Sequence, residues 1–135
     1  MSNAIYLDAQ GTERPRPEAV AMVHKCLTEA NNMAINSVIR AGMKFVASAI
    51  EHKSVLEPGM RAASICSDID FETCRVDDQG IIDLEDLRRR LEGANSVVSV
   101  MYANNEVGTI QPMDEIASIC RAHGAVLHVD AAQAR

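Results

Sequence analysis

The sequence is poor in aromatic residues, with two Tyr, two Phe and no Trp among 135 residues. A hydrophobic core therefore has to be built from Val, Ile, Leu, Met and Ala. The hydrophobic fraction of 47% and the charged fraction of 24% are nevertheless ordinary for a globular protein. The length leaves room for one domain with a modest core.

An excess of positive charge is also lacking, since the formal net charge is −6. This balance argues against a nucleic-acid partner, because nucleic acids are bound by basic surfaces. No run of apolar residues is long enough to span a membrane, and no signal-peptide pattern opens the chain. We therefore expect a cytoplasmic protein that has neither a nucleic-acid partner nor a membrane partner.

Cysteine is present, but the sequence contains neither a CxxC pair nor a Cys/His cluster with zinc-ligand spacing. We therefore expect no metal site and no disulfide framework. Free thiols in a reducing cytosol, most of them buried, are the expected state. The four cysteines are Cys26, Cys66, Cys74 and Cys120.

Extended and helical patterns alternate along the chain, which predicts an α/β domain with a mostly parallel sheet. After residue 50 we expect a loop that leads into a short helix, which Pro58 and Gly59 disturb. Other helices are expected at 84–93 and 113–124. Extended segments are expected at 5–8, 44–50, 70–76, 80–83, 96–103 and 125–131, with a turn at 77–80.

The first helix of the chain is predicted to be long. Pro17 suits the first turn of a helix, and Gly42 suits the position after its end. Read literally, the pattern gives one unbroken helix of about 24 residues. Its apolar stripe repeats at steps of three and four residues and comprises Val20, Val23, Leu27, Ala30, Ala34 and Val38.

Polar residues follow three of the predicted strands. In open parallel α/β sheets, ligands bind outside the carboxyl ends of the strands. If these strands are neighbours, then His52, Asn105, Asp130 and Gln133 converge on one rim. The polar residues are Glu51 and His52 after the first strand, Asn104, Asn105 and Glu106 after the second, and Asp130 and Gln133 at the third.

Each of these four residues also has a plain structural explanation. His52 is explained as a loop histidine, and Asn105 as a turn residue that tolerates a left-handed conformation. Asp130 is explained as the cap of a following helix, and Gln133 as a solvent-facing polar residue. Considered singly, these explanations are sufficient. Considered together, the shared rim favours a ligand site.

Several motifs resemble those of one enzyme family. The segments "EHKSVL", "VSVMYANNEVGTIQPMDEI" and "HVDAAQA" resemble motifs of the cysteine desulfurases of the NifS/IscS type, which are class-V, fold-type I enzymes dependent on pyridoxal phosphate. "TEANN" at 28–32 resembles the end of the family's phosphate-binding motif. The resemblance covers nearly the whole chain. It implies that residues 1–135 form a single, incomplete large domain without the family's small carboxyl-terminal domain.

The resemblance also implies roles for the rim residues around pyridoxal phosphate. Asp130 would pair with the protonated pyridine nitrogen, which keeps the ring electron-withdrawing. His52 would stack on the ring and transfer protons. Asn105 and Gln133 would hydrogen-bond the phenolic oxygen, and Thr28 would contact the phosphate. The implied reaction removes sulfur from L-cysteine and leaves alanine and an enzyme persulfide, whose sulfur passes to an iron–sulfur scaffold; a homodimer is implied as well.

The sequence departs from the family pattern in ways that bear on activity. In the family, the Schiff-base lysine and the persulfide cysteine lie downstream of the Asp-x-x-Gln segment, and none of Lys25, Lys44 and Lys53 matches that lysine. A stretch with a "GNPSS"-like loop is missing before "TEANN", and Cys26 and Leu27 replace the Gly-Ala that precedes the threonine. In a continuous helix the amides of residues 28–32 are not free to bind phosphate. We therefore predict that the phosphate cup is lost.

Three functions are consistent with these motifs. The chain is a desulfurase fragment that is inactive alone, because covalent chemistry with the cofactor needs the lysine. Alternatively, it is a non-catalytic remnant or a binding module that associates with a full-length desulfurase subunit. A fragment of another class-V aminotransferase or of a selenocysteine lyase is the third possibility.

Overall fold

The computed structural model describes residues 17–104 and 108–132, without the side chains of residues 19, 20, 23 and 24. The extended segment expected at 5–8 and the predicted site residues Asn105 and Gln133 lie outside the described residues. Helices and strands alternate along the described part. The strands are β1 (Lys44–Ser48), β2 (Asp70–Cys74), β3 (Ser96–Met101) and β4 (Val126–Asp130), and the helices are α1 (Pro17–Val38), α2 (Lys53–Ile65), α3 (Leu84–Leu91) and α4 (Met113–Ala122).

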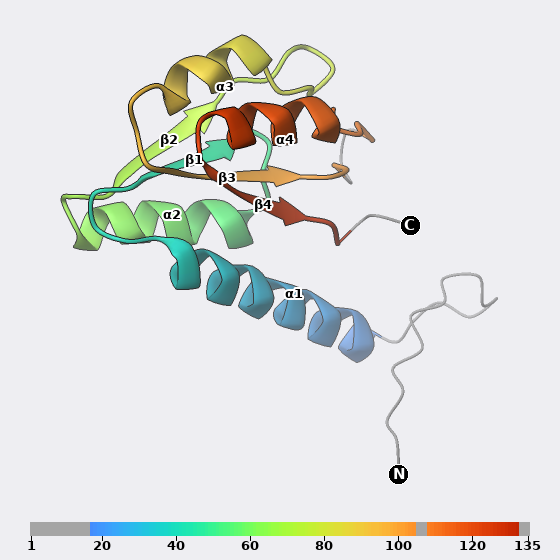
Figure 1. The fold of residues 1–135 in the computed structure, drawn as a ribbon. Helices are drawn as coiled ribbons and strands as arrows, with labels where there is room; N and C mark the ends of the chain where they lie inside the picture. Colours follow the sequence, from blue (N-terminus) through green and yellow to red (C-terminus); the bar gives the residue numbers. More distant parts are fainter. Residues whose placement is uncertain (1–16, 105–107, 133–135) are drawn as a thin grey trace.

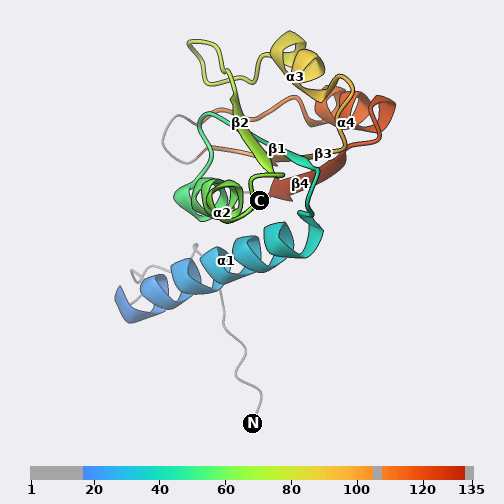
Figure 2. The ribbon, with the colours of Figure 1, turned by 90° about the vertical axis from the view of Figure 1, so that its left-hand side faces the viewer.

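The four strands form one parallel sheet in the order β2-β1-β3-β4. This confirms the predicted α/β class with a parallel sheet. Helices α1 and α2 cover one face of the sheet, and α3 and α4 cover the other (Figure 1, Figure 2). Because β1, β3 and β4 are neighbours and run in the same direction, their carboxyl ends lie at one edge of the sheet, as the sequence predicts.

The core consists of two layers, one on each face of the sheet. Aliphatic side chains dominate both, as the shortage of aromatic residues predicts. Val46, Val98 and Val100 point to the α3/α4 side, where they pack with Leu87, Leu91, Ile116, Ile119 and Cys120. Phe45, Ala47 and Val97 point to the α1/α2 side, where they pack with Ile35, Ile39, Met43 and Val55.

Helix α2 is longer and more regular than the sequence predicts. It runs without interruption through Pro58 and Gly59, both of which are buried. The rings of Phe45 and Phe71 stack beneath it with centroids 5.7 Å apart. A Cβ atom on Gly59 would lie 2.4 Å from Cδ1 of Phe45, so the glycine permits close packing on the sheet. This tertiary contact outweighs the weak helix propensity of the Pro-Gly pair, and the predicted disturbance is wrong.

Helix α1 is continuous over 22 residues, which confirms the predicted long helix. Its buried face, however, consists of Asn31 and Ile35, and Ile39, the residue after its end, continues that face. The large isoleucines define the face that packs on the sheet, and the alanines of the predicted stripe do not. The predicted stripe is thus wrong as a buried face, because Leu27 and Ala30 are exposed and Ala34 and Val38 are half-buried, while the side chains of Val20 and Val23 are not described.

The cysteines are all free thiols, as predicted. Only Cys74 and Cys120 are buried, whereas Cys66 is half-buried and Cys26 is exposed, so burial is less general than we expected. None of the helices in the described ranges combines the length and the apolar character needed to cross a membrane.

Candidate functional site

The rim at the carboxyl ends of β1, β3 and β4 is the candidate site. His52 lies where the chain turns from β1 into α2, and it is the N-cap residue of that helix. Its Nδ1 accepts a hydrogen bond from the backbone N–H of Ser54 at 3.1 Å, and the side chain is exposed. His52 is therefore more than a loop histidine, because the start of α2 fixes its ring.

A line of hydrogen bonds joins His52 to Asp130 across this rim. Nδ1 of His52 lies 2.8 Å from Oγ of Ser54. The Nδ2 amide of Asn31 donates to the same Oγ at 2.9 Å and to Oδ2 of Asp130 at 2.8 Å. Residues from α2, α1 and β4 thus meet, and two predicted site residues, His52 and Asp130, belong to one network.

The network assigns the neutral tautomer of His52. The backbone N–H of Ser54 is a donor, so Nδ1 must be the acceptor and must lack a proton. The hydroxyl of Ser54 accepts from Asn31 and has its own proton available for Nδ1. The neutral ring of His52 therefore carries its proton on Nε2, the nitrogen that the network leaves unused.

Asp130 ends β4 and is half-buried. Its Oδ1 accepts from the backbone N–H of Ala132 at 3.0 Å. Its carbonyl accepts from the N–H of Tyr102 at 2.8 Å, which extends the pairing of β3 with β4. In the described residues the carboxylate thus caps a short turn, and each oxygen keeps acceptor capacity for a ligand.

Glu51 lies beneath the rim and is 6% exposed. Its Oε1 accepts from the backbone N–H of Met101 at 2.5 Å, whereas its Oε2 is buried without a partner among the described atoms. Burial raises the pKa of Glu51 to about 8; the Met101 N–H opposes this shift, and the negative charge of Asp130 adds to it. Glu51 is therefore a neutral acid at pH 7.

His128 stands two residues before Asp130 on β4. Its Nδ1 lies 2.8 Å from Oγ of Ser99 on the paired strand β3. Burial lowers the pKa of His128, and the charge of Asp130 opposes that shift. A neutral, hydrogen-bonded imidazole thus extends the polar cluster along the α1-facing side of the sheet.

Asn104 holds the loop after β3 against the loop after β1. Its Nδ2 donates to the carbonyl of Ile50 at 3.1 Å, and its backbone N–H donates to the carbonyl of Thr109 at 2.9 Å. Asn104 therefore ties the segment after β3 to the segment after β1.

Thr28 lies inside α1, one turn before Asn31, and is half-buried. Residues three apart share a helix face, so Thr28 lies on the side of α1 that carries the contact to Asp130. The helix continues through residues 28–32, and its interior amides bond carbonyls of the preceding turn. Within the described residues, the amides of 28–32 are therefore not the free amides of a helix start, which are the groups that bind a phosphate.

The three lysines of the sequence lie in different places. Lys25 is exposed on α1 beside Glu29. Lys44 is the first residue of β1. It lies at the amino ends of the strands, opposite to the rim, and pairs with Glu72 at 3.0 Å. Lys53 follows His52 as the exposed first residue of α2. Lys53 is thus the lysine nearest to the rim in sequence.

The sequence interpretation missed the two residues that connect the network. Asn31 was assigned to a phosphate motif, although its spacing from Ile35 and Ile39 marks a second helical stripe that includes it. Ser54 stands two residues after the N-cap, which is where side-chain capping partners occur. Nothing in the sequence around Glu51 indicates that its side chain is buried.

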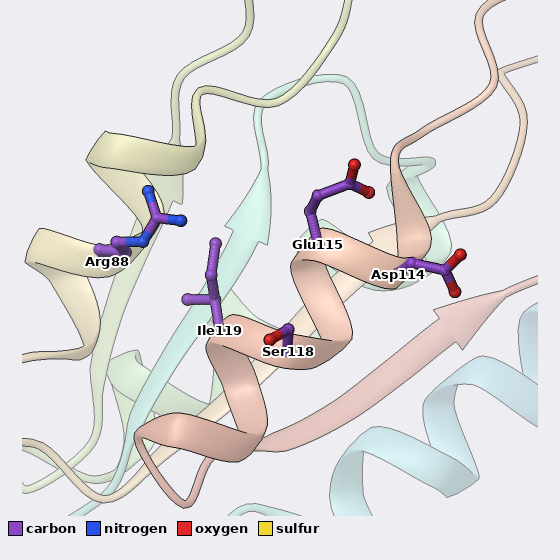
Figure 3. A pocket seen from close by; sticks show the side chains of 5 residues that line it. All are labelled: Arg88, Asp114, Glu115, Ser118 and Ile119. Carbon is purple, nitrogen blue, oxygen red and sulfur yellow. The ribbon is translucent and has the colours of Figure 1, made fainter.

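A shallow depression of about 350 Å³ lies elsewhere, between α3 and α4. Arg88 comes from α3, and the carboxylate of Asp114 points away from it (Figure 3). Arg88 already pairs with Glu85 of its own helix. Since α3 and α4 cover the face opposite to α1, this depression is separate from the rim.

Comparison with protein families gives one match over most of the chain. The model of the aminotransferase class-V family matches residues 16–135.

Curated relatives match a similar stretch. The mitochondrial cysteine desulfurase of Eremothecium gossypii is 40% identical over 111 residues, which are 79% of this chain and 22% of that protein. The cysteine desulfurase IscS of Buchnera aphidicola is 39% identical over 110 residues, which are 78% of this chain and 27% of that protein. The chain therefore spans about a quarter of the length of these relatives.

A solved structure agrees with both findings. The apo cysteine desulfurase of Thermococcus onnurineus superimposes with a TM-score of 0.69 at 30% identity, over 78% of this chain and 26% of that one.

Proposed function

This chain belongs to the aminotransferase class-V family, and from that membership we propose that it forms the ring-facing part of a cysteine desulfurase site. The observation that carries the proposal is the line of hydrogen bonds that joins His52 to Asp130 at the carboxyl rim. The substrate would be L-cysteine, the products alanine and a persulfide, and the sulfur would serve iron–sulfur cluster assembly. The relatives at 39% and 40% identity carry the name cysteine desulfurase, which favours this reaction over those of other class-V enzymes.

Pyridoxal phosphate would supply an electron-withdrawing ring that weakens bonds at the α-carbon of a bound amino acid. In this chain Asp130 offers a carboxylate to the ring nitrogen, and Asn31 and the Ala132 N–H hold that carboxylate in place. His52 presents a proton on Nε2 at the same rim, which suits a proton-transfer role. Asn105 and Gln133 remain candidates for contacts with the phenolic oxygen.

We further propose that the 135-residue chain does not catalyse the reaction alone. Continuous helix through residues 28–32 supports this, because free amides at a helix start are what bind a phosphate. None of the three lysines occupies the described network of the rim, and covalent chemistry on the cofactor needs a lysine.

The test is to incubate the purified chain with pyridoxal phosphate and L-cysteine, reduce with borohydride, and locate any attached cofactor by mass spectrometry. We expect no lysine labelled in stoichiometric yield and no alanine above the level of free cofactor. Stoichiometric labelling of one lysine, together with alanine release that Asp130→Asn abolishes, would overturn the proposal of inactivity. Amino transfer without release of sulfur would instead overturn the assignment to desulfurases.

A second candidate function is association with an intact desulfurase subunit. The observation in its favour is that β4 is an edge strand on which Val126 and Val129 are exposed. Unpaired edges and apolar patches of this kind favour association. Size-exclusion chromatography of the chain, alone and mixed with an intact cysteine desulfurase, tests this. Co-elution supports the association, and a monomer that ignores the partner contradicts it.

A further inference from the structure

Asn31 occupies an unusual position for an asparagine in a helix. It is 9% exposed and lies on the face of α1 that also buries Ile35 and Ile39. Asparagine is a poor helix former, and a buried amide must satisfy its hydrogen bonds. An apolar residue would suit this face better for packing alone, so the amide has another purpose.

The orientation of the Asn31 amide is determined by chemistry. An ionised carboxylate only accepts hydrogen bonds, so the atom that faces Oδ2 of Asp130 must be the nitrogen. The same nitrogen has a second proton, and it reaches Oγ of Ser54 at 2.9 Å. One side chain therefore donates simultaneously to the carboxylate of β4 and to the hydroxyl of α2.

Each donation has a consequence for the rim. The bond to Asp130, together with that from Ala132, fixes the plane of the carboxylate. The bond to Ser54 uses a lone pair of the hydroxyl and leaves its proton to point at Nδ1 of His52. The imidazole is thereby held with Nδ1 as an acceptor.

We infer that Asn31 is a positioning residue of this site, which sets the carboxylate plane of Asp130 and, through the hydroxyl of Ser54, supplies Nδ1 of His52 with a second donor beside the Ser54 backbone N–H. The functional meaning of this positioning rests on the proposed function. The hydrogen bonds themselves belong to the chain and do not require a cofactor.

The isosteric variant Asn31→Asp tests this role. It keeps the shape of the side chain but replaces both donors by acceptors and places a carboxylate against Asp130. The hydroxyl of Ser54 then donates to residue 31 and no longer to Nδ1 of His52, which keeps only the backbone N–H of Ser54 as a donor. The matched control is Asn32→Asp, which makes the same charge change at the next, half-buried position of α1, outside the network.

The measurement is a long-range ¹H–¹⁵N correlation spectrum of the histidine rings in the labelled chain, at a pH where the imidazole is neutral. We expect His52 to be protonated on Nε2 in all three proteins, and the Nδ1 resonance to move in Asn31→Asp but not in Asn32→Asp, because Nδ1 then loses the Ser54 hydroxyl as a donor and keeps only the Ser54 N–H. A purely structural tether would lower stability without moving the Nδ1 resonance in the folded protein. An unchanged Nδ1 resonance in folded Asn31→Asp would overturn the inference.

A second measurement keeps the test valid if Asn31→Asp does not fold. The two amide protons of Asn31 face different acceptors, so Ser54→Ala should shift one of them and leave the other in place. Equivalent, rapidly exchanging amide protons in the wild type, or a wild-type His52 protonated on Nδ1, would also overturn the inference. These signals are independent of alanine release, so failure of the desulfurase assay and failure of this inference are distinguishable.

Discussion

The residues of the rim divide into those that face a ligand and those that hold them. His52 has an unused Nε2, and Asp130 has further acceptor capacity on both bonded oxygens, whereas Asn31 and Ser54 bond each other and these two residues. Glu51 has a different position, since it is buried below the rim with one oxygen bonded to the backbone and one unpaired. Of the rim residues, Asp130 is the one whose charge acts on Glu51 and raises its pKa.

Glu51 should make stability depend on pH. Its pKa rises from 4.5 to about 8 in the folded protein, so between these values the folded state binds a proton that the unfolded state has lost. The free energy of unfolding should therefore fall as pH rises through this window, by on the order of 5 kcal/mol in total. Urea unfolding across the window measures this decline.

The control is Glu51→Gln, which cannot titrate and should have a much flatter profile over the same window. Asp130→Asn removes a negative charge that opposes ionisation of Glu51 and so lowers the folded-state pKa of Glu51. We therefore expect the decline to end at a lower pH and to be smaller than in wild type, with the same onset. Parallel profiles for wild type and Glu51→Gln would show that Glu51 titrates normally.

At the scale of elements, packing against the sheet decides which faces of the helices are buried. Helix α1 buries Ile35 and Ile39 against β1 and β3 residues, and α2 approaches the phenylalanine pair through Gly59. Both features involve residues far apart in the sequence. Each yields a prediction that separates a buried position from an exposed one on the same helix.

Ile35→Ala should destabilise the protein by about 2–5 kcal/mol, because it removes a fully buried side chain and leaves a cavity. Met33→Ala on the exposed side of the same helix should change the free energy of unfolding by no more than about 0.5 kcal/mol. Chemical denaturation of the two variants measures both values. Equal losses would show that the buried face of α1 is assigned wrongly.

Gly59→Ala should also destabilise, by about 1–3 kcal/mol, although alanine is the better helix former. The added Cβ would meet Phe45 and Phe71 at 2.4 and 2.7 Å. Ser64→Ala, at an exposed position of the same helix, is the control. A higher melting temperature for Gly59→Ala would mean that α2 lies further from the sheet.

The sequence allowed much of this fold to be predicted, because the alternation of patterns depends on local periodicity. The parallel sheet, the long first helix and the convergence of three strand ends follow from such patterns. The link between His52 and Asp130 could not be predicted, since it depends on Asn31 and Ser54, which lie 23 residues apart and meet only when α1 packs on α2. The course of α2 through Pro58 was mispredicted for the same reason.

At the scale of the whole molecule, the sheet has an exposed edge at β4. A parallel sheet is usually covered on both faces and at its edges, and here Val126 and Val129 are 44% and 37% exposed. Charged side chains on edge strands prevent strand-to-strand association. The edge is therefore the part of the molecule where association should be most sensitive to substitution.

Val129→Lys should shift the chain towards the monomer in sedimentation velocity experiments, and Val126→Lys combined with it should shift it further. Met60→Lys, at an exposed position of α2 away from this edge, is the control and should not change the distribution. Self-association that survives both valine substitutions would exclude the β4 edge as the interface.

The order of the strands also governs when the rim comes into being during synthesis. Strand β3 must insert beside β1 before β4 can dock, and β4 leaves the ribosome after the other three strands. A nascent chain that has emerged only as far as α4 already has both hydrophobic layers, yet it has no carboxylate for Asn31 to bind. The docking of one short strand thus brings the carboxylate of Asp130 to the amide of Asn31 after the residues of both hydrophobic layers have emerged.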